Sequence, residues 1–170
     1  MNELKNAGDF SFNIPNVTDE EILNYLNQRE YITIASFISP YTGIPHMCPV
    51  WGVFVEGKYY FQTDDHTFKV KFIKKGNNKL GISVTDPSLF PDYSEDSIPY
   101  LGLGGTATIR TKEHFKDFEK ILMLIFLKYI IDEEERTKVF NFVLDKMKAR
   151  SLIEIIPEWV KVPRVPKKNS

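Results

Sequence analysis

Apolar and polar residues follow a helical period in some parts of the chain and a strand-like composition in others. Residues 19–29 place apolar side chains at helical spacing behind Thr18, which can cap the first turn while Glu21 completes a capping box. Residues 31–38 are rich in β-branched and aromatic side chains and stop at the turn-forming sequence Pro-Tyr-Thr-Gly. These patterns predict a first helix followed by a first strand.

Residues 47–55 form the next expected strand, and their side chains are apolar on both faces. A strand of this kind is covered on both sides, so we expect a barrel interior on one side and a helix or a partner subunit on the other. The Glu56-Gly57 pair then predicts a turn into a strand over 58–63, which completes a hairpin.

Prolines at positions 45 and 49 are unusual in such a strand. Proline has no N–H to donate, so it is confined to strand starts, edges and bulges, and the backbone groups opposite it lack partners. Some other group must therefore complete the hydrogen bonding around Pro45 and Pro49.

The rest of the chain continues as short strands with helices inserted and appended. The expected elements are a short helix within 64–76 closed by Gly76, a strand over 80–85, a long loop over 86–99, a strand over 100–109, helices over 112–131 and 133–149 with Asp132 capping the second and Glu135 in support, and a last strand over 152–156. About six mostly antiparallel strands favour a mainly β fold, a small barrel, over a parallel α/β sheet. No glycine-rich dinucleotide motif follows any of these strands, so a Rossmann fold is not supported.

Composition limits the classes of partner and compartment. A chain of 170 residues, 42% of them hydrophobic, fits one globular domain over 1–170. A net charge of -1 gives no general attraction to nucleic acid or to a membrane surface. The start of the chain lacks the apolar core of a secretory signal, and the apolar run 121–127 is shorter than the ~20 residues that span a bilayer. With a single cysteine, Cys48, no intramolecular disulfide can form, and we expect a soluble cytoplasmic protein.

Residues 62–71 contain the groups that phosphate binding requires. Hydroxyls at Thr63 and Thr67 and the ammonium group of Lys69 lie where a strand ends and a helix begins, and free N–H groups beside a cation form an anion site. Several lysines over 69–79 are also compatible with a solvated helix face, so the pattern alone leaves both interpretations open.

Three motifs, I-P-H-M-C-P-V-W, Y-Y-F-Q-T and T-F-K, follow one another in this order. In order and spacing they resemble the flavin-binding split barrels of the pyridoxamine 5'-phosphate oxidase-like group, over residues 31–109 and the C-terminal I-E-I-I-P-E-W-V. The resemblance implies a split β-barrel that binds FMN between the subunits of a homodimer. It also implies hydride or electron transfer, by the flavin, to a small-molecule substrate.

The resemblance also implies which residues contact the cofactor. The residues expected to line the isoalloxazine and ribityl groups are His46, Met47, Cys48 and Pro49, flanked by Gln62 and Thr63, and those expected at the phosphate are Thr67 and Lys69. Backbone groups around Pro49 would then pair with the edge of the flavin ring, which is our hypothesis for the prolines.

The chain departs from this group at several positions. Phe68 stands where the family commonly has an arginine, and the tail 159–170 does not resemble the arginine and histidine motif that holds pyridoxal phosphate in the oxidases proper. We therefore do not expect pyridoxamine phosphate oxidase activity itself.

Several alternatives remain open at this stage. The same fold can hold a deazaflavin in place of FMN, or carry a flavin without catalysis. A heme-binding split barrel ranks lowest, because those relatives rely on a histidine in a C-terminal extension and the last histidine here is His114. No general acid or base is identifiable, although Tyr59, Tyr60 and Tyr100 are candidates. The histidines are scattered without paired acidic ligands, so no metal site is expected.

Overall fold

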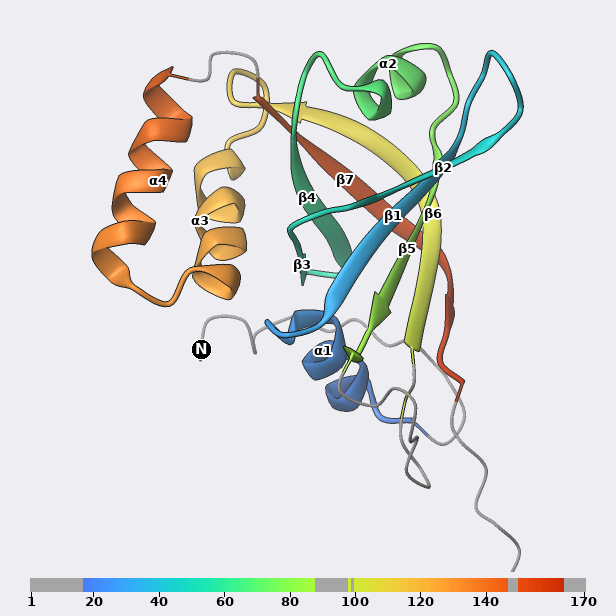
Figure 1. Ribbon diagram of the computed structural model, residues 1–170, viewed down its shortest axis with the longest axis horizontal. Coiled ribbons are helices and arrows are strands. Elements are labelled where there is room, and N and C mark those ends of the chain that lie inside the picture. Colours follow the sequence, from blue (N-terminus) through green and yellow to red (C-terminus); the bar gives the residue numbers. More distant parts are fainter. Residues whose placement is uncertain (1–16, 88–97, 99, 147–149, 164–170) are drawn as a thin grey trace, which may run out of the picture.

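A single antiparallel sheet organises the computed structural model, which describes residues 17–87, 98, 100–146 and 150–163 (Figure 1). In chain order the elements are α1 (Asp19–Asn27), β1 (Ile32–Ile38), β2 (Pro45–Pro49), β3 (Gly52–Val55), β4 (Lys58–Asp64), α2 (Phe68–Lys74), β5 (Lys79–Thr85), β6 (Tyr100–Thr111), α3 (Phe118–Tyr129), α4 (Glu133–Lys146) and β7 (Arg150–Lys161). The seven described strands have the order β2-β1-β5-β6-β7-β4-β3. The expected mainly β barrel is confirmed.

The two edges of this sheet are consecutive in sequence. β2 pairs with β1 at one edge and β3 pairs with β4 at the other, yet only Val50 and Trp51 separate β2 from β3. The sheet therefore curls until its edges approach each other, and the chain crosses from one edge to the other, as Figure 1 shows. The single strand expected over 47–55 is wrong, because its two halves pair with different neighbours.

The prolines of β2 occupy positions where no hydrogen-bond donor is needed. The N–H of Val50 donates to the carbonyl of Thr33 in β1 over 3.0 Å. Along an edge strand the backbone groups of alternate residues point inward, toward the neighbouring strand, or outward, away from the sheet, and this bond places Val50 among the inward ones. Pro45 and Pro49 then fall on outward positions of an edge strand, with Met47 between them. Since outward N–H groups do not join the ladder, proline is tolerated there.

The outward groups of β3 are paired with side chains from helices. The Gly52 N–H donates to the Tyr129 hydroxyl (3.3 Å), and the Gly52 carbonyl accepts from Lys128 Nζ (3.0 Å). The Phe54 N–H donates to Asn27 Oδ1 (2.9 Å), and its carbonyl accepts from Asn27 Nδ2 (3.0 Å). Protein groups therefore complete the hydrogen bonding just beyond the prolines, which corrects the hypothesis of a flavin partner for this part of the segment.

Two apolar clusters lie on opposite faces of the sheet. The inner cluster fills the barrel and includes Phe54, whereas Val53 and Val55 point to the outer cluster, which α3 and α4 cover. The expectation that this segment is covered on both faces is therefore confirmed for β3. In β2 the Met47 side chain is 75% exposed within the single chain, and its cover by a partner subunit stays a prediction.

Most other expected elements are present, with shifted ends. The capping box of Thr18 and Glu21 closes the start of α1 as predicted. The helix expected from residue 112 begins only at Phe118. The chain first makes a turn, in which the Thr111 carbonyl accepts hydrogen bonds from the N–H groups of His114 and Phe115. The last strand is longer than expected and pairs with both β4 and β6. Most of the expected loop 86–99 lies outside the described residues.

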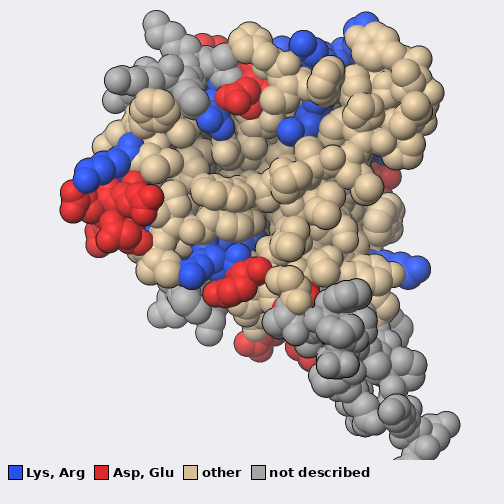
Figure 2. Space-filling model, viewed as in Figure 1, with Lys and Arg blue, Asp and Glu red and all other residues tan. Residues whose placement is uncertain are grey.

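Helix α4 begins as the sequence predicted. The N–H of Glu135 donates to Asp132 Oδ1 over 2.7 Å, which caps the helix. Figure 2 shows the acidic side chains gathered at this end, where negative charge is favoured by the helix dipole. Residues 147–149 of the expected helix lie outside the described part. None of the described helices is long and apolar enough to cross a membrane.

Asn27 offers a test of how the β3 edge is stabilised. Asn27→Ala is expected to lower the free energy of unfolding by about 1–3 kcal/mol, because two backbone groups of the buried Phe54 lose their partners. Asn24→Ala, on the exposed face of the same helix, is the matched control and should change it by less than about 0.5 kcal/mol. Urea denaturation followed by circular dichroism measures both, and equal losses would contradict this role.

Candidate functional site

A cavity of about 380 Å³ lies between β2 and the start of α2. Its lining residues are Phe37, His46, Met47, Cys48, His66, Thr67, Phe68 and Lys69. The cavity joins the first and third sequence motifs, although about twenty residues separate them. His46, Met47 and Cys48 therefore face the same space as Thr67 and Lys69, as the resemblance implied.

The turn between β4 and α2 is held by threonine hydroxyls. Thr67 Oγ1 donates to the Asp64 carbonyl over 2.8 Å and lies 3.1 Å from Thr63 Oγ1. The Thr67 side chain makes no capping hydrogen bond to α2. Its hydroxyl thus fixes the turn that places Lys69 at the cavity. At its other end α2 stops before Gly76, whose φ of 88° favours glycine.

Aromatic rings form one wall of this cavity. The His46 ring stacks on Phe37 with centroids 5.8 Å apart, meets Phe72 edge-on at 5.7 Å, and lies 6.3 Å from Phe68. Phe68 is 64% exposed. The His46 ring is therefore held by stacking, and a flat apolar surface lies beside it.

The acidic residues near the cavity are engaged by the start of β7. Arg150 Nε lies 3.3 Å from Asp64 Oδ1, and the hydroxyl of Ser151 donates to Asp65. Within the described residues Lys69 has no carboxylate at ion-pair distance. Asp64 is thus paired with a cation and Asp65 with a hydroxyl, both from residues more than eighty positions later, which no local pattern could have revealed.

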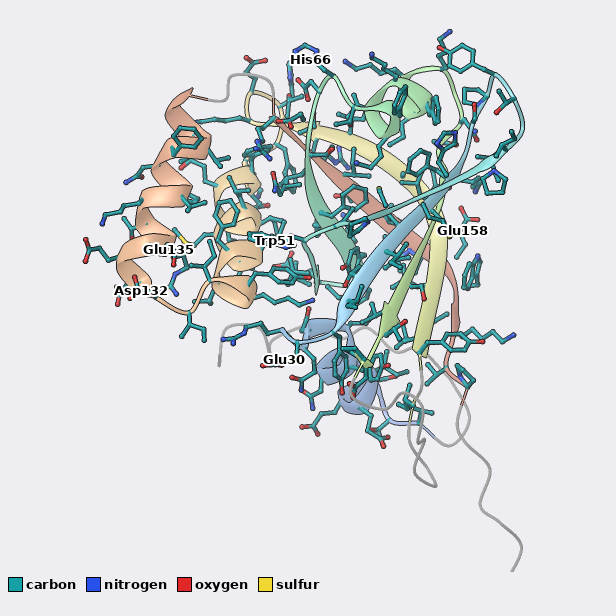
Figure 3. The ribbon with its side chains drawn as sticks, in the orientation of Figure 1. Glu30, Trp51, His66, Asp132, Glu135 and Glu158 are labelled. Atoms are coloured by element: carbon teal, nitrogen blue, oxygen red, sulfur yellow. The ribbon has the colours of Figure 1, made fainter. Side chains whose placement is uncertain are left out.

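Three of the expected cofactor contacts do not line the cavity. Gln62 accepts a hydrogen bond from Arg150 on the neighbouring strand. Thr63 is buried behind Thr67, and Pro49 lies at the exposed end of β2. Sequence analysis missed Phe37, which lies in β1, and His66, which Figure 3 labels just beyond the end of β4. Phe37 gave no signal beyond that of a buried strand residue.

The tyrosines considered as acid or base candidates lie elsewhere. Tyr59 is fully buried in the inner core, and burial raises its pKa well above the usual value. The Tyr60 hydroxyl donates to the buried carboxylate of Glu154 over 2.9 Å, and Tyr100 begins β6. None of the three appears among the residues lining this cavity. Across the described residues, His, Cys, Asp and Glu side chains form no group that could hold a metal.

Lys128 and Tyr129 hold the crossing, the segment 50–52 where the chain passes from β2 at one edge of the sheet to β3 at the other. Lys128 Nζ donates to the carbonyls of Gly52 (3.0 Å) and Leu26 (2.9 Å) and is almost completely buried. Trp51 stacks on the Tyr129 ring, with centroids 5.1 Å apart. Because burial disfavours the charged amine, the pKa of Lys128 is lowered to about 7.

The comparisons with known proteins identify the fold. No family model and no curated protein matches the chain. A conserved hypothetical protein from Mycobacterium tuberculosis superposes with a TM-score of 0.69 at 14% identity, over 91% of this chain and 92% of that chain. An F420 reductase has a TM-score of 0.54 at 18% identity, over 81% and 94%.

A third solved structure adds a flavin-binding protein to this group. A pyridoxamine 5'-phosphate oxidase-related, FMN-binding protein from Nostoc punctiforme has a TM-score of 0.53 at 15% identity, over 80% of this chain and 74% of that chain. The chain therefore has the split-barrel fold of the pyridoxamine 5'-phosphate oxidase-like proteins. The resemblance seen in the three motifs is confirmed at the level of the fold.

Lys128 makes the stability of the fold depend on pH. The folded chain releases this proton near pH 7, whereas the unfolded chain keeps it to the usual lysine value of 10.5, so unfolding takes up a proton between these limits. Stability should therefore rise with pH above 7, by up to about 1.4 kcal/mol per pH unit. Urea denaturation between pH 6 and 9 measures the slope.

Lys128→Met is expected to remove this slope, because methionine cannot titrate. Lys120→Met is the matched control on the same helix, since Lys120 is exposed and pairs with Glu56. The control should keep the slope of the unchanged protein. A slope that survives in Lys128→Met would assign the pH dependence to other groups.

Proposed function

We propose that the chain binds FMN in the cavity between β2 and α2 and acts as a flavin-dependent oxidoreductase on a small molecule. The observation that supports this most directly is the meeting of His46, Met47 and Cys48 with Thr67 and Lys69 in one cavity. The names of two similar structures, an FMN-binding protein and an F420 reductase, agree with a flavin-type ligand. When bound, the flavin would supply the hydride or electron transfer.

Lys69 and Thr67 would hold the phosphate end of the cofactor. Both line the cavity, and Lys69 has no ion-pair partner among the described residues. The carboxylate of Asp64 is already paired with Arg150, so it opposes an anion less strongly than a free acid would. An ammonium group donating to a phosphate oxygen forms a charge-assisted hydrogen bond, which is stronger than a neutral one.

The isoalloxazine ring would lie along β2. Between Pro45 and Pro49, the outward backbone groups of Met47 face away from the sheet, where they can pair with the donors and acceptors at the edge of a planar ring. The stacked rings of His46 and Phe37 provide an apolar surface for ring contact. These side chains would orient the cofactor and exclude water from one side of it.

A deazaflavin is the second candidate cofactor. One similar structure is named as an F420 reductase, and the exposed ring of Phe68 gives this cavity an aromatic surface. Mass spectrometry of the cofactor released from the purified protein separates the two candidates. Turnover with a nicotinamide reductant then separates an enzyme from a non-catalytic flavin carrier.

A homodimer would complete this site. The side chains of Tyr41, Ile44 and Met47 are 64%, 60% and 75% exposed, and they lie on and before the open edge strand β2. Exposed apolar side chains beside unpaired backbone groups are typical of a surface that another chain covers. Subunits related by a two-fold axis would use this same surface on both copies.

Lys69 provides the sharpest test of the phosphate assignment. Lys69→Ala should weaken FMN binding roughly tenfold to a hundredfold, because a charge-assisted contact contributes about 1.5–3 kcal/mol. Riboflavin lacks the phosphate and should bind equally well to both forms. Fluorescence titration of each flavin into the cofactor-free protein measures the affinities.

Lys74→Ala is the control for nonspecific charge, because Lys74 is exposed in the last turn of α2. Its effect on either flavin should be small, since exposed charges are screened by salt. If both lysine variants lose FMN affinity equally, or if riboflavin loses as much as FMN, the lysines belong to a solvated face. The phosphate assignment of Thr67 and Lys69 would then be abandoned.

The dimer is tested by light scattering at micromolar concentration with cofactor bound. We expect a dimer, and we expect Met47→Glu to shift it to monomer because a charge would be buried at the contact. Phe142→Glu changes an exposed side chain of α4 in the same way and should leave the dimer intact. A monomeric unchanged protein would overturn the proposal.

A further inference from the structure

A second cleft, of about 350 Å³, lies between α1 and the ends of α3 and α4. It shares no lining residue with the cavity at β2. Three apolar side chains form what we call its floor, namely Leu23, Leu127 and Ile131. Three cations form its cationic wall, namely Arg29, Lys128 and Arg136. Amide side chains and Glu30 complete the lining.

The cationic wall is balanced by little negative charge. Arg29 and Glu30 are 3.8 Å apart, and both are largely exposed, so their attraction is weak. Arg136 Nη1 donates to the carbonyls of Ile130 and Ile131, which fixes the guanidinium at the cleft. Figure 2 shows basic side chains beside an acidic one in the region where Figure 3 labels Glu30, between α1 and the end of α3.

Lys128 is the unusual member of this wall. Its ammonium group is held by two carbonyl oxygens, and no carboxylate of the described residues lies at ion-pair distance from it. A buried charge without a counter-ion is unfavourable, and an anion that entered the cleft would supply one. The floor beside it offers an apolar surface to the rest of such a ligand.

We propose that this cleft binds a small carboxylate with an apolar body, its carboxylate at the cationic wall and its body on the floor. The volume lies in the range of ligand sites, roughly 300–1,000 Å³. The inference is independent of the proposed flavin function, because it uses none of the residues at β2.

Hexanoate is a suitable probe, and hexan-1-ol is its neutral counterpart. Isothermal titration of the full chain at pH 6.5 should show saturable binding of hexanoate that is at least about tenfold tighter than that of hexan-1-ol, as expected for a charge-assisted contact. Equal binding of the two compounds, or no saturable binding of hexanoate, would overturn the proposal. Lys69→Ala should leave hexanoate binding unchanged, and its loss in that variant would assign binding to the β2 cavity instead.

Two exposed neighbours test the cleft without disturbing the core. Arg29→Gln should weaken hexanoate binding and Glu30→Gln should strengthen it, each about two- to fivefold, as for exposed charges. These opposite changes are specific to an anion in this cleft. Shifts in the same direction, or none in either variant, would refute the assignment.

The pH dependence tests Lys128 itself. Hexanoate affinity should fall severalfold between pH 6 and 9, because Lys128 loses its proton in this range. The other charged groups that line the cleft are Arg29, Glu30 and Arg136. Burial raises the pKa values of the Tyr129 and nearby Tyr59 hydroxyls, so they stay protonated. Lys128→Met should remove the pH dependence, whereas Lys120→Met on the same helix should retain it. The reverse result would exclude Lys128 from the site.

Discussion

Backbone hydrogen bonding along residues 45–55 is the constraint on which the rest of this structure depends. The segment leaves one edge of the sheet and joins the other, so its outward N–H and C=O groups have no strand beside them. Pro45 and Pro49 have no N–H, so no acceptor is needed at these two positions of β2. Asn27, Lys128 and Tyr129 supply hydrogen-bond partners for the outward backbone groups of β3. These hydrogen bonds connect the ends of α1 and α3 to the β3 edge of the sheet.

The need to pair the outward backbone groups of β3 also explains why the amine of Lys128 is buried. Lys128 joins the C-terminal end of α1 to the crossing, and its burial lowers its pKa into the physiological range. A neutral side chain could pack there, but it would leave the Leu26 carbonyl without this donor. The crossing thus lies between two recesses, the cavity at β2 and the cleft at α1, which share no lining residue.

The cavity at β2 combines aromatic groups with Lys69, while the start of β7 pairs Arg150 with Asp64 and Ser151 with Asp65. Arg150 reaches Asp64 because the register of β4 and β7 places these two residues opposite each other. Phe68 contributes exposed apolar surface. In the flavin proposal the cationic group and the aromatic groups serve different parts of the ligand, so the two parts of the proposal are separately testable.

Local chemistry made the elements predictable: the capping residues of α1 and α4, the turn at Glu56-Gly57 and the motifs at β2 and α2 act through near neighbours. The motif order also gave the split-barrel fold and most of the cavity residues. Only the tertiary structure decided that 47–55 is two strands on opposite edges, that Arg150 neutralises Asp64, and that Lys128 is buried beside Gly52. These features depend on strand register and helix packing between residues far apart in the chain, which a pattern of near neighbours does not encode.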